Sequence, residues 1–298
     1  MATIYTQQSS NVRKTWLLMT GFLVAVIAIG YAVSWYLSNP AIVYIAVIFA
    51  LGMNVYSYWF SDKLVLKMTG AKPVTKEEAP ELYNIVENLA ITAGLPMPKI
   101  YLVNDPAPNA FATGRNPEHA VVAATTGLLQ MLDRNELEGV MAHEMAHVGN
   151  RDMLVMTVAV VLAGFVAILA DFLSRAIFFG GGDRDRSPVF LILGIVGIIL
   201  APIAAQMIQM AVSRKREYLA DASAALLTRY PEGLASALEK ISASHLPMRK
   251  ASHATAHLFI SDPYASEGKR SIGQKINNLF ATHPPAQDRI NRLREMGK

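Results

Sequence analysis

The 298-residue sequence contains no cysteine. This absence excludes disulfide bonds, thiolate zinc sites and cysteine nucleophiles, so any metal ligands must be His, Asp or Glu. It fits a reducing compartment without proving one. Charged residues are also scarce, at 17%, against 52% hydrophobic residues and a mean hydropathy of +0.29. The chain is therefore too apolar for a typical soluble protein.

The sequence also lacks a strong charge of one sign. Its formal net charge is only +4, and the basic residues gather beside apolar segments. This distribution is typical of residues at a membrane surface and does not favour nucleic-acid binding. We therefore expect contact with a lipid bilayer and no nucleic-acid partner.

Four apolar segments predict four membrane spans, at residues 16–37, 41–60, 153–170 and 188–212. The first has no charged residue and is long enough for a helix to cross about 30 Å of hydrocarbon. It is too long for a cleaved signal peptide, and a second span follows at once, which indicates a retained anchor. The third and fourth segments are less uniform. A pair of buried helices in a soluble core is their alternative interpretation.

Basic residues predict the orientation of these spans. The turn between the first two spans carries no charge, and the loop between the last two carries both signs equally. The other flanks are basic, with Arg13, Lys14, Lys63, Lys67, Lys72, Arg214, Lys215 and Arg216. By the positive-inside rule, both termini and residues 61–151 face the cytoplasm.

The remaining sequence divides around these spans. Residues 1–67 form a two-span anchor, residues 68–152 and 213–298 are globular, and residues 153–212 are the third and fourth membrane segments. The first globular part predicts a helix from Thr75 to Gly94, three strands within residues 99–125, and a second helix capped by Asp133 and Glu136. This order predicts an α+β domain that the second membrane pair interrupts.

The stretch "VMAHEMAHVGNRD", residues 140–152, contains the pattern His-Glu-x-x-His. On a helix, His143 and His147 lie one turn apart on one face, so both imidazoles can reach one ion. Glu144 lies beside them and could take a proton from a water whose pKa zinc lowers to about 7. Two histidines on a buried helix are the competing interpretation of so short a pattern. Residues 150–152 would mark the membrane boundary.

A catalytic zinc needs a third protein ligand. The stretch "SRKREYLADASAA" offers Glu217, with Asp221 one helical turn further on. Glu217 could bind the ion while Asp221 accepts the free N–H of a ligand histidine, expected to be His143. Taken alone, such an acidic pair in a basic helix is more typical of a solvated face, so both interpretations stay open here.

A second histidine pair has the same spacing. His253 and His257 are four residues apart but have no glutamate between them, and nothing nearby offers a third ligand or a base. We therefore interpret them as a surface or substrate-cleft pair and not as a second metal site.

Four motifs, taken in order, resemble the HtpX proteases. They are His143-Glu144-x-x-His147, then "RKREYLAD" after two apolar spans, then "ATAHLFI" and "THPPAQDRINRL". HtpX proteases are membrane-bound zinc metalloproteases of bacteria, related to the CAAX prenyl proteases of eukaryotes. The resemblance covers nearly the whole chain.

The resemblance implies an integral-membrane α-helical anchor of four spans with a cytoplasmic α+β zincin-like metalloprotease domain. It places the chain in the bacterial inner membrane, with both termini and the active site cytoplasmic. It further implies an endopeptidase with one Zn2+ per chain, whose substrates are unfolded or misassembled membrane proteins and beside which other membrane proteases could act. On this resemblance, Glu217 becomes the third zinc ligand and Asp221 supports a ligand histidine.

The resemblance also suggests residues around the cleft. "PNAFATG" looks like the edge strand of the family, where Asn109 and Ala110 would pair with an extended substrate through main-chain groups. In the C-terminal motif, His283 or Arg289 would steady the developing oxyanion or tie down the helix of Asp221. A structural turn held by Arg289 is an equal alternative.

Two rival functions remain at this level. An intramembrane protease would need zinc inside the bilayer, but the flank before the motif, residues 132–142, is polar, which favours a site at or just below the surface. A catalytically silent membrane scaffold or holdase would keep zinc only for structure. The presence of all expected ligands and of the base disfavours it.

Overall fold

The computed structural model describes residues 4–179, 213–250, 255–264 and 284–297. The fourth predicted span, residues 188–212, lies outside the described residues, as do His253 and His283. The described helices and strands are α1 (Ile4–Leu37), α2 (Ala41–Thr69), β1 (Lys72–Pro73), α3 (Pro80–Ala93), β2 (Lys99–Val103), β3 (Ala110–Thr113), η1 (Pro117–His119), β4 (Val121–Thr125), α4 (Thr126–Met131), α5 (Arg134–Gly149), α6 (Asp152–Phe179), α8 (Arg214–Thr228), α9 (Pro231–Ala243), η2 (Ala256–Leu258) and α11 (Ala286–Met296).

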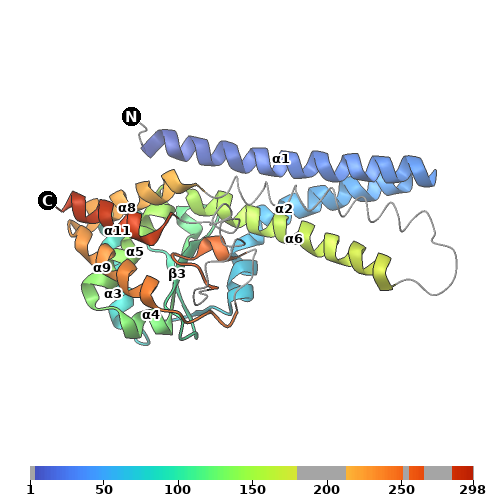
Figure 1. Ribbon diagram of the computed structural model, residues 1–298. Coiled ribbons are helices and arrows are strands. Elements are labelled where there is room, and N and C mark those ends of the chain that lie inside the picture. Colours follow the sequence, from blue (N-terminus) through green and yellow to red (C-terminus); the bar gives the residue numbers. More distant parts are fainter. Residues whose placement is uncertain (1–3, 180–212, 251–254, 265–283, 298) are drawn as a thin grey trace.

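Helices α1 and α2 form a hairpin that projects from a globular body (Figure 1). Both are long and apolar enough to cross a membrane. Gly30 allows a close approach, since a Cβ added there would lie 2.4 Å from the Cβ of Ala46. Large side chains such as Trp35, Tyr44 and Ile48 are exposed along the hairpin, as expected of a lipid-facing surface. The first two predicted spans are therefore helices with the length and the apolar surface expected of membrane spans.

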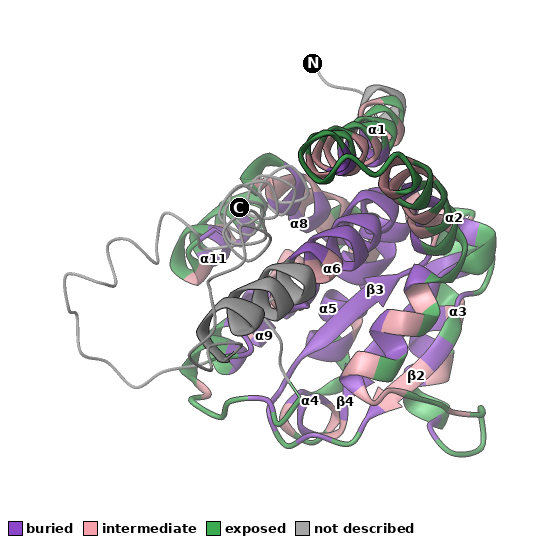
Figure 2. Ribbon diagram, turned by 90° about the vertical axis from the view of Figure 1, so that its right-hand side faces the viewer, coloured by how far each residue is buried: buried purple, intermediate pink, exposed green. Residues whose placement is uncertain are grey.

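The third predicted span begins as a buried helix. Residues 153–163 of α6 are all buried, and α6 packs against α1, α2 and β3 (Figure 2). Helices α5 and α6 meet at an angle of 81°, so they could form one span only as a broken pair. By length and composition, the described residues contain two candidate spans, or three if this bent pair counts as one, and a count of four is not confirmed.

The sheet is mixed, with the strand order β1-β2-β4-β3. Strands β2 and β4 are parallel, whereas the other two pairs are antiparallel. Ala110 and Ala112 of β3 join the core cluster that contains α3 and α5, whereas Phe111 joins the cluster that contains α6. Helices thus cover both faces, which explains why β3 and β4 are apolar at successive positions. The predicted strands, including β3 at the edge, are confirmed.

Helix α3 begins later than the sequence predicts. The carboxylate of Glu78 accepts the backbone N–H of Thr75 at 2.8 Å, but the helix starts at Pro80. Proline disfavours helical geometry in the residue before it, and Ala79 accordingly has φ −140° and ψ 64°. Proline itself suits the first helical position. The predicted start at Thr75 is wrong, whereas the predicted end at Gly94, a left-handed cap with φ 64°, is confirmed.

Helix α5 lies at the centre of the globular body. Its capping box is confirmed, because Asp133 accepts the N–H of Glu136 at 3.0 Å and Glu136 accepts that of Asp133 at 2.9 Å. Helix α9 approaches α5 closely at Gly139, where an added Cβ would meet the backbone nitrogen of Leu234 at 2.6 Å. Residues of α3, α5, α9 and α11 share one hydrophobic core. The two globular parts of the sequence therefore fold together.

Candidate metal centre

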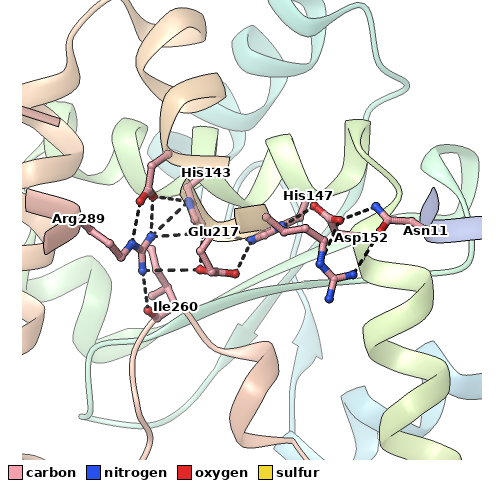
Figure 3. A network of polar contacts seen from close by, with 9 residues as sticks. Asn11, His143, His147, Asp152, Glu217, Ile260 and Arg289 are labelled. Carbon is pink, nitrogen blue, oxygen red and sulfur yellow. Dashed lines mark hydrogen bonds and ion pairs between the residues drawn. The ribbon is translucent and has the colours of Figure 1, made fainter. Parts of the chain in front are cut away.

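Helix α5 holds the two motif histidines inside the globular body. His143 is 1% exposed and His147 6%. As expected for positions one turn apart, the rings are neighbours, edge to face, with their centroids 4.7 Å apart. Their Nε2 atoms approach to 3.2 Å (Figure 3). Both rings thus aim the same nitrogen at one point.

Helix α8 brings Glu217 to this point. One carboxylate oxygen lies 3.5 Å from Nε2 of His147, and the other lies 3.7 Å from Nε2 of His143. The ligand atoms of the three residues all lie within 4.8 Å of one another, and all three residues are buried. Ligand atoms about 2.0–2.1 Å from a tetrahedral zinc would be separated by about 3.3 Å. The spacing therefore suits a zinc ion.

The partners of the other ring nitrogens support a metal. Nδ1 of His143 lies 2.9 Å from a carboxylate oxygen of Asp221, and Nδ1 of His147 lies 3.1 Å from one of Asp152. Since a carboxylate accepts a hydrogen bond, we assign the ring proton to Nδ1 in both histidines. The Nε2 lone pairs then face each other and repel unless a cation lies between them. The donor set of two imidazoles and a carboxylate fits zinc, and the predicted pairing of Asp221 with His143 matches the geometry.

Negative charge surrounds His147. Burial lowers the pKa of His147, but the hydrogen bond to Asp152 and the charge of Glu217 outweigh burial and raise this pKa to about 9. The carboxylates therefore attract positive charge to the imidazole, as a proton or as a metal ion.

Glu144 follows His143 on α5 and is also buried, at 1% exposure. Burial raises the pKa of Glu144 to about 7, and the charge of Glu217 adds to this effect. The charge of His147 and a backbone hydrogen bond from Ala112 on β3 oppose the rise. A carboxyl group whose pKa lies near neutrality can both accept and return a proton at physiological pH.

Arg289 reaches the centre from α11. Its Nε and Nη2 donate to the two carboxylate oxygens of Asp221 at 2.9 and 2.7 Å, and its Nη1 lies 3.7 Å from Glu217. This bidentate pair holds α11 against α8. Of the three roles suggested for Arg289, which are steadying the oxyanion, tying down the helix of Asp221 and holding a structural turn, the contacts with Asp221 agree with the second.

Asp152 also contributes to the centre, although its position in the sequence predicts only a membrane boundary. In an unbroken helix, residues five apart do not share a face. The left-handed backbone of Arg151, with φ 57°, ends α5 and turns Asp152 back toward His147. The sequence "GN" at Gly149 and Asn150 is a signal for a helix end that could have revealed this turn.

Arg216 and Asn11 complete this side of the centre. Arg216, predicted to be a basic membrane flank, is buried, and its Nε lies 3.7 Å from Asp152. Asn11 on α1 is buried too and donates to Asp152 at 2.6 Å. Arg216 is thus part of the centre as well as of the basic flank, and no signal within the sequence pointed to Asn11.

The predicted substrate contacts lie against the chain itself. The carbonyl of Ala110 accepts the N–H of Ile260 at 3.0 Å, and the amide of Asn109 donates to the carbonyl of Ser261 at 3.0 Å. His257, predicted to be a surface or cleft residue, is buried, with Nε2 3.4 Å from the carbonyl of Met156. Asn109 and Ala110 are therefore not open in this structure, and their role as substrate contacts stays a prediction.

Sequence comparison relates the chain to known peptidases. The profile described as "Peptidase family M48" matches residues 76–297. A "Protease HtpX homolog" of Caldanaerobacter subterraneus subsp. tengcongensis is 46% identical over 303 residues, which cover 99% of this chain and 98% of that protein. A protein of the same description from Pyrococcus furiosus is 47% identical over 285 residues, 95% of each chain.

A solved structure resembles the fold. The crystal structure of S. mikatae Ste24p is similar with a TM-score of 0.52 and 17% sequence identity, and the similarity covers 97% of this chain and 67% of that one. At this level of identity the likeness concerns the fold alone.

Proposed function

Because the chain belongs to Peptidase family M48, and within it to the HtpX-type metalloproteases, we propose that it is a membrane-anchored zinc endopeptidase that cleaves damaged or misfolded membrane proteins from the cytoplasmic side. The observation that carries the proposal is the convergence of His143, His147 and Glu217 beside the buried carboxyl group of Glu144. Three protein ligands with one position left open are typical of a catalytic zinc, whereas structural sites are closed by four.

Each group of residues in the centre has a separate role in this reaction. His143, His147 and Glu217 would hold the ion, and zinc when bound supplies a Lewis acid that polarises a peptide carbonyl and activates water. Glu144, buried beside the three ligands, accepts the proton of the attacking water and returns it to the leaving amine. Asp221 and Asp152 hold the two imidazoles through their Nδ1 atoms.

The edge strand β3 offers a place for an extended substrate. A backbone hydrogen bond joins Ala112 of this strand to Glu144, so a peptide added along β3 would lie beside the base. The segment 259–261 already pairs with β3 near Asn109 and Ala110. A substrate that uses these two residues would therefore have to displace this segment.

The position of the hairpin supports action from the cytoplasm. Gln8 and Asn11, just before Arg13 and Lys14 on α1, bind the end of α5 and the start of α6. The basic end of α1 therefore lies on the side of the protease body. If the positive-inside rule holds, that side faces the cytoplasm, where the centre could meet the exposed segments of damaged membrane proteins.

The test replaces the base and keeps the ligands. In the full chain in detergent, Glu144→Gln is expected to retain one zinc per chain by metal analysis, because the three ligands are unchanged. Cleavage of an unfolded test protein should fall by at least about a hundredfold, since general base catalysis contributes about that much or more. Glu138→Gln, on the same helix, is the matched control and should cleave normally. Undiminished cleavage by Glu144→Gln would refute the mechanism.

A further inference from the structure

The first part of α1 reaches the metal centre through one side chain. Asn11 is 1% exposed. Its Nδ2 donates to Oδ1 of Asp152 at 2.6 Å and to the carbonyl of Asn150 at 3.0 Å. The other carboxylate oxygen of Asp152 lies 3.1 Å from Nδ1 of His147 (Figure 3). A chain of contacts thus joins the first apolar helix to a metal ligand.

The amide of Asn11 also separates two charges. Its Oδ1 accepts from Nη1 of Arg216 at 3.3 Å while its Nδ2 donates to Asp152. These contacts identify which terminal atom of the Asn11 amide is the oxygen and which is the nitrogen. Nε of Arg216 stays 3.7 Å from the Asp152 carboxylate, too far for a hydrogen bond. Asp152 therefore keeps one oxygen fixed by Asn11 and the other directed at His147.

We propose that Asn11 is a positioning residue of the metal centre: it acts through Asp152 to hold the ring of His147, so that zinc affinity depends on how α1 docks at the corner between α5 and α6. This inference rests on the proposed zinc site. It adds that the anchor does more than tether the protease, because the anchor helps to build the site. The contacts place the NH2 group of Asn11 against Asp152, where it donates to the oxygen that does not face His147.

Gln8 provides a matched control on the same helix. It lies about one turn before Asn11, and its Nε2 donates to the carbonyl of Gly149 at 2.7 Å. Both side chains therefore fasten α1 to the same corner. Only Asn11 contacts the carboxylate that holds a metal ligand, so the pair separates helix docking from positioning of His147.

The experiment measures metal binding by the full chain in detergent. After removal of metal, zinc affinity is measured by competition with a chromophoric chelator, and the visible spectrum of the Co2+-loaded protein reports ligand geometry. Asn11→Ala should weaken zinc binding about tenfold, the lower end of the effect usual for groups that orient ligands, and should shift the Co2+ bands. Gln8→Ala should change neither. If Asn11→Ala does not fold, Asn11→Leu, which keeps the size of the side chain but has no donor and no charge, should show the same loss.

A double-mutant cycle tests the route through Asp152. In an Asp152→Ala background, Asn11→Ala should cause no further loss of zinc affinity, because the group through which it acts is gone. Any of three results would overturn the inference. Asn11→Ala could lower zinc affinity equally in both backgrounds, it could leave zinc affinity and the Co2+ spectrum unchanged, or Gln8→Ala could lower zinc affinity as much as Asn11→Ala does. A wild-type chain that binds no zinc would instead contradict the proposed function, so the two failures are distinguishable.

Discussion

At the scale of single residues, the polar interior of the centre depends on charge pairs. Arg289 is 2% exposed and meets Asp221 with two hydrogen bonds. Burial raises the pKa of the Asp221 carboxyl, but the charge of Arg289 and the hydrogen bond of His143 outweigh burial and hold that pKa below its ordinary value. Removing one member of such a pair leaves a buried charge without its partner, which costs more than the pair itself contributes.

Arg289→Ala should therefore destabilise the protein strongly. We expect a loss of about 3–5 kcal/mol in the free energy of unfolding of the metal-free chain, measured by denaturant titration in detergent. Arg294→Ala on the same helix is the control. Arg294 pairs with Glu232 and Glu239 at the surface, where solvent screens the charges, so its loss should cost far less than the loss of Arg289.

A different result would change the role of Arg289. If Arg289→Ala abolished cleavage while the unfolding of the metal-free protein stayed the same, the side chain would act on the oxyanion of the reaction. That role is another of those that the sequence suggested for it.

At the scale of elements, α5 is held from several sides, and Glu136 joins it to α9. The carboxylate of Glu136 accepts from Lys240 at 2.7 Å, from Ser236 at 2.6 Å and from the N–H of Asp133 at 2.9 Å. Burial raises the pKa of Glu136, but these hydrogen bonds outweigh it and hold the pKa below its ordinary value. The folded state therefore favours the ionised carboxylate.

This shift predicts a dependence of stability on pH. The pKa of Glu136 is lower in the folded than in the unfolded chain, so the ionised carboxylate stabilises the fold. This stabilisation is fully present above the unfolded pKa, near 4.5, and is lost as the pH falls through the folded pKa. Glu136→Gln should lower the free energy of unfolding at pH 7 by about 1–3 kcal/mol. The difference from the wild type should shrink below about pH 4.5.

The control for this prediction is Glu138→Gln, two positions along the same helix, because Glu138 makes none of these three contacts with its carboxylate. Unfolding curves over a series of pH values measure both variants. A difference between Glu136→Gln and the wild type that stays constant as the pH falls would contradict the prediction.

At the scale of the whole molecule, the projecting hairpin and the globular body set the orientation in the membrane. The turn between α1 and α2 lies at the far end of the hairpin from the body (Figure 1). If the hairpin spans the bilayer, this turn and the body lie on opposite sides. The absence of cysteine makes this arrangement testable by single cysteines.

We expect an impermeant maleimide to label Ala41→Cys, at the start of α2, from outside intact cells. Glu118→Cys, an exposed position on η1 in the body, should react only after the membrane is made permeable. The wild-type chain without cysteine is the control and should not react. Labelling of Glu118→Cys in intact cells would place the protease body outside and contradict the cytoplasmic orientation.

Features that follow a local period can be predicted from the sequence alone. The spacing of His143 and His147 places them one helical turn apart in any α-helix, and the capping box of α5 lies within one turn. Long apolar runs likewise predicted α1 and α2, and runs of apolar β-formers predicted the strands. Spacing alone left two interpretations of Glu217, a zinc ligand or part of a solvated face. The resemblance in motifs was needed to choose the ligand.

Which distant residues support the ligands depends on how the helices pack, so it could not be predicted from the sequence. Asn11 and Asp152 are 141 positions apart, and Asp221 and Arg289 are 68 apart. No local period relates such positions, because their contact depends on how α1, α8 and α11 pack around α5 and on the turn at Arg151. The ligands thus follow from helix geometry, whereas the charges that orient them follow from the packing of whole helices.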